Sequence, residues 1–341
     1  MLRIRLVNEL PPNRDPLPHD HNLPNRLSTT NLHTHGLHVS PDGIADNVLR
    51  ETEPGQTYDI EVPIPASHPP GTYWYHPHRH GSANVQVAGG MAGALILEGD
   101  FADVPEIARA RERVLILQQL AFDALGTVES FDTVWPNQAA RLFTVNGQLM
   151  PTIAMRPGEV QRWRIIHAGF HDSTPIGLDH HVLHEIAADG IALPRVRTQD
   201  SILVVPGQRT DVLVKAGSPG TYALRSLPFD QGEGPNRIWV LARVVVGGDP
   251  LPMNVPAALP RDRSRRSART NSPARARSLS RHDRPPPGGT ISASSASWLT
   301  IACSIPIGST SAFASARSRS GRSPISTRPT TPSTFIPIPS S

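Results

Sequence analysis

The stretch that decides the fold runs from Asn31-Leu32-His33-Thr34-His35-Gly36 to Gly71-Thr72-Tyr73-Trp74-Tyr75-His76-Pro77-His78. Each end carries a His-x-His pair within a run of β-strand composition. Successive side chains of a strand point to opposite faces, so both histidines of a pair face the same way. At about 3.3 Å rise per residue, their Cβ atoms lie roughly 6 to 7 Å apart, which suits ligands of two different ions in one cluster. Imidazole is a good ligand for copper, zinc, iron or nickel. One such pair is readily coincidence, but two pairs indicate a metal site.

Runs of strand-like composition surround the two pairs and are separated by turns rich in Gly and Pro. Many short strands at this spacing predict antiparallel β-sandwiches or barrels. The sequence therefore predicts an all-β fold with one sandwich over 1–100 and a second over 105–250, joined by a short helix over 105–113. We expect strands at 2–7, 57–62, 71–75, 93–97, 114–118, 142–145, 160–166, 182–187, 201–205, 210–214, 220–224 and 238–246.

The composition changes abruptly near the end of the second sandwich. Over 255–341, Ser, Pro, Arg, Ala and Thr dominate, and no period of 2 or 3.6 persists. A segment of this kind cannot bury enough apolar surface to fold, so it predicts a disordered tail. From Leu259 onward the tail holds thirteen Arg and two Asp, which accounts for the chain's net charge of +4 and pI of 9.8. A nucleic-acid partner would depend on the tail alone, and none is predicted.

Cysteine content and apolar runs exclude several classes of protein. With 341 residues the chain can form two domains. Cys303 is the only cysteine, which excludes a disulfide framework and a cysteine-rich metal site. No apolar run is long enough to cross a membrane, so no membrane partner is predicted. The stretch Met1–Val7 alternates like a strand and lacks the apolar core of a signal peptide. Either the protein is cytoplasmic or its true beginning is missing.

The two histidine motifs resemble those of the multicopper oxidases, the family of laccases, ascorbate oxidase and bilirubin oxidase. The first motif is His33-Thr34-His35-Gly36, and the second is His76-Pro77-His78 after Gly-Thr-Tyr-Trp-Tyr. The resemblance covers roughly residues 1–254. It continues through Ala88-Gly89-Gly90-Met91-Ala92-Gly93-Ala94-Leu95-Ile96, Phe143-Thr144-Val145-Asn146-Gly147-Gln148, Arg156-Pro157-Gly158-Glu159, Arg162-Trp163-Arg164 and Val205-Pro206-Gly207-Gln208-Arg209.

The resemblance implies a fold, a cofactor and a reaction. The family fold is a run of cupredoxin-like Greek-key β-sandwiches, in agreement with the predicted strands. Four coppers in the family couple one-electron oxidation of a small reducing substrate, such as a phenol or a metal ion, to reduction of dioxygen to water. Family members are expected in the periplasm or outside the cell, whereas this sequence has no signal peptide.

The resemblance also assigns roles to individual residues. His33 would be a ligand of the type 2 copper, and His35, His76 and His78 would be ligands of the type 3 pair. An acid after the first motif commonly assists proton delivery in the family. Asp46 fits that role best and Asp42 second, while a turn-forming or strand-capping role stays open for either residue.

Two parts of the family pattern do not occur in the sequence. The type 1 site needs a Cys thiolate with two His, but no His-Cys-His is present, since Cys303 lies between Ala302 and Ser304. The third domain, which supplies the other half of the trinuclear ligands, is also absent. The sequence therefore predicts a truncated multicopper oxidase that is inactive alone. The alternatives are a copper-binding protein without turnover and, ranked last, a two-domain oxidase that completes its cluster between subunits.

The last residues of the sequence suggest that another reading frame encodes part of the third domain. When the codons of Thr330–Ser341 are shifted by one base, the genetic code permits His-Pro-Phe-His-Ile-His, which resembles the third copper motif of the family. We therefore predict that the reading frame shifts shortly after residue 254 and that the tail is out-of-frame translation. The alternative is a genuine Ser/Arg-rich disordered tail. A nucleotide sequence that encodes no copper motif in another frame would refute the frameshift.

Overall fold

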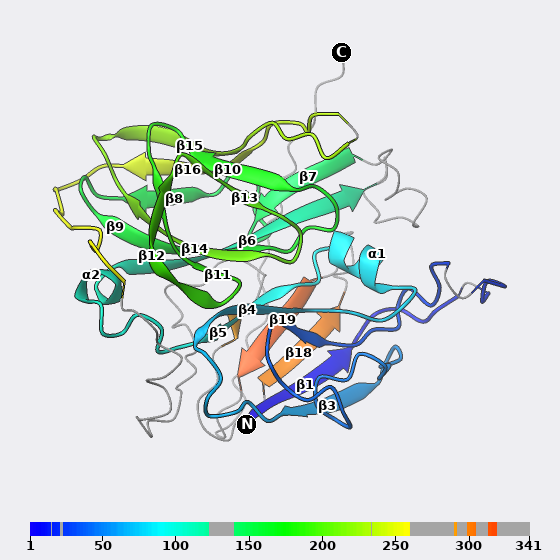
Figure 1. Ribbon diagram of the computed structural model, residues 1–341. Helices are drawn as coiled ribbons and strands as arrows, with labels where there is room; N and C mark the ends of the chain where they lie inside the picture. Colours follow the sequence, from blue (N-terminus) through cyan, green and yellow to red (C-terminus); the bar gives the residue numbers. More distant parts are fainter. Residues whose placement is uncertain are drawn as a thin grey trace, which may run out of the picture.

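The computed structural model describes residues 1–14, 16–20, 23–122, 140–232, 234–259, 290–291, 299–304 and 313–318. These residues form two β-sandwiches, drawn mainly in blue and in green in Figure 1. The predicted all-β fold is therefore confirmed. No helix among the described residues is long and apolar enough to cross a membrane.

The first sandwich carries both His-x-His pairs. In β1 (Leu2–Asn8) the alternation of Leu2, Ile4 and Leu6 with polar residues buries one face of the strand, as expected for a two-layer structure. One sheet has the order β19-β18-β1-β3 and the other β17-β5-β4-β2. Their remaining strands are β2 (His33–His35), β3 (Thr57–Val62), β4 (Gly71–His76), β5 (Gly93–Leu97), β17 (Thr290–Ile291), β18 (Leu299–Ser304) and β19 (Phe313–Ser318), and α1 (Ala83–Ala88) lies between β4 and β5 in the sequence.

The second sandwich pairs a six-stranded sheet, β12-β11-β14-β9-β6-β7, with a five-stranded sheet, β13-β10-β15-β16-β8. Its core is built from Leu, Ile and Val around Trp163, which is fully buried. Its strands are β6 (Arg111–Phe122), β7 (Ala140–Val145), β8 (Thr152–Met155), β9 (Val160–His167), β10 (Thr174–Leu178), β11 (Leu183–Ala188), β12 (Ile191–Gln199), β13 (Ser201–Val204), β14 (Arg209–Lys215), β15 (Gly220–Ser226) and β16 (Val240–Val246).

The connecting helix is shorter than the sequence indicates. We predicted it over 105–113, but α2 (Pro105–Ala108) is shorter, and β6 already begins at Arg111. Residues 111–113 join the parallel pairing of β6 with β9, so sheet hydrogen bonds replace the last turn of the predicted helix.

Three short segments of the predicted tail form strands, where β17, β18 and β19 join the sheets of the first sandwich. In Figure 1, β18 lies beside β1. The strand contains the short apolar, β-branched run Leu299-Thr300-Ile301-Ala302, and Ile301 is fully buried in the core of the first sandwich. Pairing with an existing strand gives such a run the backbone hydrogen bonds that it cannot make alone. Apart from residues 255–259, the rest of the predicted tail lies outside the described residues.

Apolar contacts and buried ion pairs join the two sandwiches. Trp74, Ala94 and Ile96 of the first pack against Ile116 and Ile166 of the second in one buried cluster. This interface holds the strand that carries His76 against the second sandwich.

Charged residues line the same interface. Asp211 of β14 accepts hydrogen bonds from the Thr72 hydroxyl at 2.6 Å and from the guanidinium groups of Arg162 and Arg164. Asp100 accepts from the same two guanidinium groups. All four charged side chains are at most 7% exposed, so each charge depends on its partners rather than on water.

Candidate metal centre

Antiparallel pairing of β2 with β4 brings the two His-x-His pairs together. His33 is the register partner of His76, and His35 is the partner of Trp74. Side chains at opposing positions of adjacent antiparallel strands lie close on one face of the sheet. Each motif places its two histidines on the same face of its strand, and the register of β2 with β4 sets the two motifs side by side. The local sequence and the strand pairing together therefore explain why the histidines lie close to one another.

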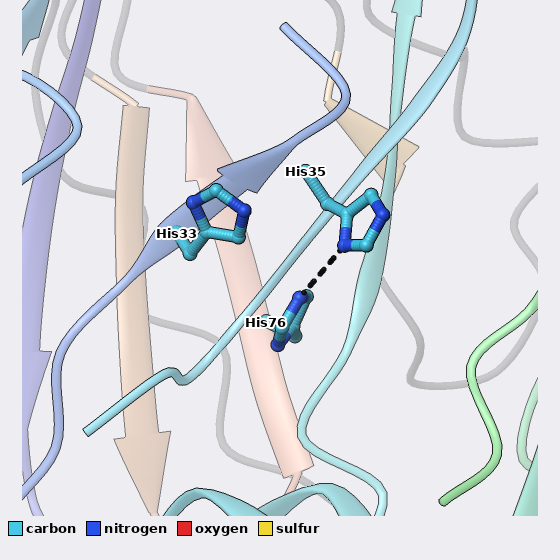
Figure 2. A group of neighbouring side chains, drawn as sticks. All are labelled: His33, His35 and His76. Atoms are coloured by element: carbon cyan, nitrogen blue, oxygen red, sulfur yellow. Dashed lines mark hydrogen bonds between the residues drawn. The ribbon is translucent and has the colours of Figure 1, made fainter. Parts of the chain in front are cut away.

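Three imidazoles form a tight group in Figure 2. One ring nitrogen each of His33, His35 and His76 can be chosen so that all three lie within 4.8 Å of one another. The ring centroids of His33 and His35 are each 5.3 Å from that of His76, and Nδ1 of His35 lies 3.1 Å from Nε2 of His76. Between two facing imidazole nitrogens either a shared proton or a metal cation can reside, so this group fits a metal centre.

His78, the fourth predicted ligand, lies at the edge of this group. Its ring centroid is 5.2 Å from that of His33 and 5.9 Å from that of His76, and its side chain is exposed. His35, His76 and His78 all line one pocket of about 520 Å³. Gly169 and Phe170 of the second sandwich line the same pocket. The structure therefore gathers all four histidines at one place, with His78 most accessible to a ligand entering from outside.

Hydrogen bonds on the far side of two rings orient their free nitrogens. Nδ1 of His33 donates to Oδ2 of Asp46 at 2.9 Å, and Nδ1 of His76 donates to the carbonyl of Pro77 at 2.8 Å. In both rings the Nε2 lone pair is then left for a metal, which is the usual arrangement of metal-binding histidines.

Of the two candidate acids, only Asp46 contacts a candidate ligand in the structure. Its side chain is 8% exposed, and its second oxygen accepts the backbone N–H of Thr34 at 2.8 Å. Burial alone would raise the pKa of Asp46, but the hydrogen bond from His33 and the N–H of Thr34 hold that pKa below its usual range. Asp42 lies in an exposed turn, where its N–H bonds the Ser40 hydroxyl.

The environment keeps two of the imidazoles neutral. Burial, together with the nearby Arg209 guanidinium, lowers the pKa of His35 to about 4. Burial lowers the pKa of His76 to about 3. Only a neutral imidazole has a lone pair to give to a metal, so both rings are ready to bind at neutral pH.

The low pKa values make the stability of the metal-free protein depend on pH. In the unfolded chain these imidazoles titrate near pH 6.5, whereas in the folded protein His35 and His76 titrate at about 4 and 3. Between these values the unfolded state binds more protons, so the free energy of unfolding is expected to fall as the pH drops from 7 to 4. Urea denaturation at pH 7 and pH 5 measures this slope. The His35→Gln/His76→Gln variant is expected to show a smaller slope, with buried His167 providing part of the remainder; an equal slope in both proteins would contradict the assignment.

Two residues that support the site were not singled out from the sequence. Asn31 is 4% exposed, and its Oδ1 accepts the backbone N–H of His78 at 2.6 Å. Arg209 reaches from the second sandwich, donates to the carbonyls of Thr72 and Asp189, and stands over the ring of Tyr73. Asn31 directly precedes the first motif, but nothing in the sequence near Arg209 indicates its contact with the first sandwich.

Gly36, which ends the first motif, is required by this contact with Arg209. Its φ of +88° lies in the left-handed region that favours glycine. A Cβ atom at this position would also lie 2.3 Å from an Nη atom of Arg209. The motif therefore needs its glycine both for the turn after β2 and for the approach of the second sandwich.

Comparisons with known proteins relate the chain to one family. Two family models match the chain, both described as multicopper oxidase, one over residues 21–101 and the other over residues 119–240. The chain is 29% identical over 204 residues to the iron transport multicopper oxidase FET5 of Saccharomyces cerevisiae, covering 55% of this chain and 31% of that protein. It is 29% identical over 215 residues to Laccase-2 of Podospora anserina, covering 58% of this chain and 32% of that protein. The chain thus spans about a third of the length of these relatives.

A solved structure shares the fold. A multicopper oxidase from Campylobacter jejuni, described as a metallo-oxidase, superposes with a TM-score of 0.61 at 23% identity, covering 77% of this chain and 52% of that one. The family model that matches residues 21–101 includes both His-x-His pairs. The chain belongs to the multicopper oxidase family.

Proposed function

We propose that this chain supplies four histidine ligands, His33, His35, His76 and His78, to a copper cluster of the type 2 and type 3 kind. The observation that supports this proposal is the group of three imidazole nitrogens within 4.8 Å, held on two paired strands. Neutral imidazoles on a rigid sheet are suitable ligands for copper. When bound, the copper ions of such a cluster accept electrons and pass them to dioxygen.

The residues around the ligands have their own roles in this proposal. Asp46 holds His33 in the tautomer with a free Nε2, and Asp46 is the acid that we assign to proton delivery. Trp74 stacks on His76, with ring centroids 4.2 Å apart, and so fixes the plane of that ligand. Arg209 keeps the second sandwich against β4, and its charge helps to keep the pKa of His35 low.

The reaction we propose for the intact oxidase is oxidation of phenols or metal ions coupled to reduction of dioxygen. The sequence contains no His-Cys-His motif, on which entry of electrons at a type 1 copper depends in this family. We therefore propose that this chain by itself binds copper without turnover.

Copper loading and oxygen uptake test the two parts of this proposal separately. The metal-free chain is mixed with Cu(II), freed of unbound ions, and analysed for copper, then assayed for oxygen uptake with a phenolic donor and with Fe(II). We expect retained copper and no uptake above that of free copper. Failure to retain copper would contradict the binding site, whereas uptake, or an absorbance band at about 600 nm from a Cu–thiolate bond, would contradict the absence of turnover.

The effect of an Asp→Asn substitution on copper affinity distinguishes the two candidate acids, Asp46 and Asp42. Asp46→Asn keeps the size of the side chain but removes the negative charge that accepts the Nδ1–H of His33. Loss of such a partner typically lowers metal affinity about 10- to 100-fold. Competition with a chelator of known affinity measures this loss for copper. Asp42→Asn is the matched control and is expected to leave copper affinity unchanged, since Asp42 lies in an exposed turn. Equal effects of the two substitutions would contradict the role of Asp46.

A further inference from the structure

His167, the last residue of β9, is bonded to two segments of the second sandwich that line the pocket of the metal centre. One segment contains Gly169 and Phe170, and the other is the turn at Gly207. This turn lies against a candidate ligand, because a Cβ atom at Gly207 would be 3.3 Å from Cε1 of His35. His167 itself does not line the pocket, so it acts on the metal centre through these two segments.

The backbone and the ring of His167 each hold one of the two segments. The Gly207 N–H donates to the carbonyl of His167 at 2.8 Å, and the His167 N–H donates to the carbonyl of Gln208 at 2.9 Å. The Gly169 N–H donates to Nδ1 of the His167 ring at 3.1 Å. A Cβ atom at Gly169 would lie 2.5 Å from Cε1 of His167, so this segment lies directly on the ring.

The bond to Gly169 requires one particular form of the ring. Nε2 of His167 lies 3.1 Å from the Thr174 hydroxyl, which donates to the carbonyl of Asp172 at 3.1 Å. Because the single proton of that hydroxyl is used, Nε2 donates to it and Nδ1 keeps the lone pair that accepts the Gly169 N–H. His167 is 0% exposed, and burial lowers its pKa to about 4, so the ring has this neutral form at pH 7.

A proton on Nδ1 would turn the acceptor of the Gly169 N–H into a donor. Two N–H groups would then face each other in a buried place, where an unsatisfied donor is costly. The charged group nearby is Asp172, which raises the pKa of His167, but burial outweighs it. The other groups around His167 are Gln119 of β6, Phe143 of β7, Thr174 of β10, Gln208 before β14, and His171, whose Nδ1 lies 2.6 Å from Asp172.

We propose that His167 is a positioning residue of the pocket wall: its neutral ring holds Gly169 and Phe170 in place, and its protonation releases them. In acid this segment leaves the ring while the sheets of the second sandwich stay paired, and the pocket opens on that side. The proposal rests on the proposed function only for what the pocket holds, because the bonds that support it belong to the metal-free chain.

Hydrogen exchange of the metal-free full chain at pH 7 and pH 5, measured by NMR, tests this release. The ring titrates at about 4 when the segment is closed and near 6.5 when it is free, so the protection factor of the Gly169 amide is expected to fall about 20-fold. The Ile165 amide, inside β9, is expected to stay better protected than Gly169 at both pH values. Unchanged protection of Gly169, or equal protection of Gly169 and Ile165, would overturn the proposal.

Two substitutions separate the acceptor from the ring. In His167→Asn the amide oxygen stands near the position of Nδ1 and does not titrate, so Gly169 is expected to stay protected without the 20-fold fall. In His167→Gln the amide lies near the position of Nε2 instead, so Gly169 is expected to lose protection at both pH values. A 20-fold fall that persists in His167→Asn would assign it to His171 and Asp172, and equal protection in the two variants would remove the acceptor role; either result overturns the proposal.

Copper analysis of the same wild-type sample separates this proposal from the proposed function. A chain that retains no copper but shows the expected fall at Gly169 contradicts the copper site and supports the role of His167. A chain that retains copper while the protection of Gly169 is the same at both pH values overturns the role of His167 alone.

Discussion

Replacing His76 by Gln is expected to lower the affinity of the chain for copper by on the order of 100-fold or more, which exceeds the usual loss when only a supporting residue is removed. His76 is the central member of the group, with ring centroids 5.3 Å from both His33 and His35. Its Nε2 also faces Nδ1 of His35 at 3.1 Å, so its removal leaves His35 without the partner that orients it. Competition titration with a copper chelator measures the affinity.

His38→Gln is the matched control for this substitution. It also removes one imidazole from the first sandwich, but the His38 side chain is exposed and does not line the pocket. We expect its copper affinity to equal that of the wild type, with unchanged circular dichroism for both variants. If the two substitutions weaken copper binding equally, copper binds to scattered surface histidines rather than at the centre described above.

Replacing Asp211 by Asn is expected to destabilise the protein by about 3–5 kcal/mol, because removal of one partner from a buried ion pair leaves an uncompensated charge. Asp211 is 2% exposed and accepts hydrogen bonds from Arg162, Arg164 and Thr72. Asp100 and the partly exposed Glu112 would then be left to balance two buried guanidinium groups. The midpoint of thermal unfolding is expected to drop by roughly 10 °C.

Asp59→Asn is the control, since it removes a carboxylate from an ion pair with Arg5 in which both side chains are about 40% exposed. Exposed pairs of this kind contribute about 0–1 kcal/mol. A similar loss of stability in the two variants would contradict the argument from burial.

The sequence predicts the strands that alternate clearly and the pairs of histidines on one face. β3 and β5 have the predicted bounds, 57–62 and 93–97. β3 alternates between polar and apolar residues, and β5 is a short continuous apolar run, so both are signalled by the local sequence. The helix predicted over 105–113 was too long because pairing with β9, more than 40 residues away, extends β6 into it.

Features that depend on distant partners could not be predicted. Whether Asp46 or Asp42 faces His33 depends on the path of one loop, in which both acids fit a turn. Arg209 meets Gly36 only when the sandwiches are packed together. The tail strands β18 and β17 pair with β1 and β5, which lie far away in the sequence, whereas the composition of the tail alone indicates disorder. The frameshift and the copper roles of the four histidines stay predictions, and the nucleotide sequence tests the first.

Diffraction from copper-loaded crystals at the copper absorption edge is the most direct test of the metal centre. The anomalous difference map is expected to show its strongest peak among the Nε2 atoms of His33 and His76 and the ring of His35, inside the pocket that His78 also lines. A map whose copper peaks all lie elsewhere, or one without a peak between β2 and β4 at full copper loading, would contradict the account.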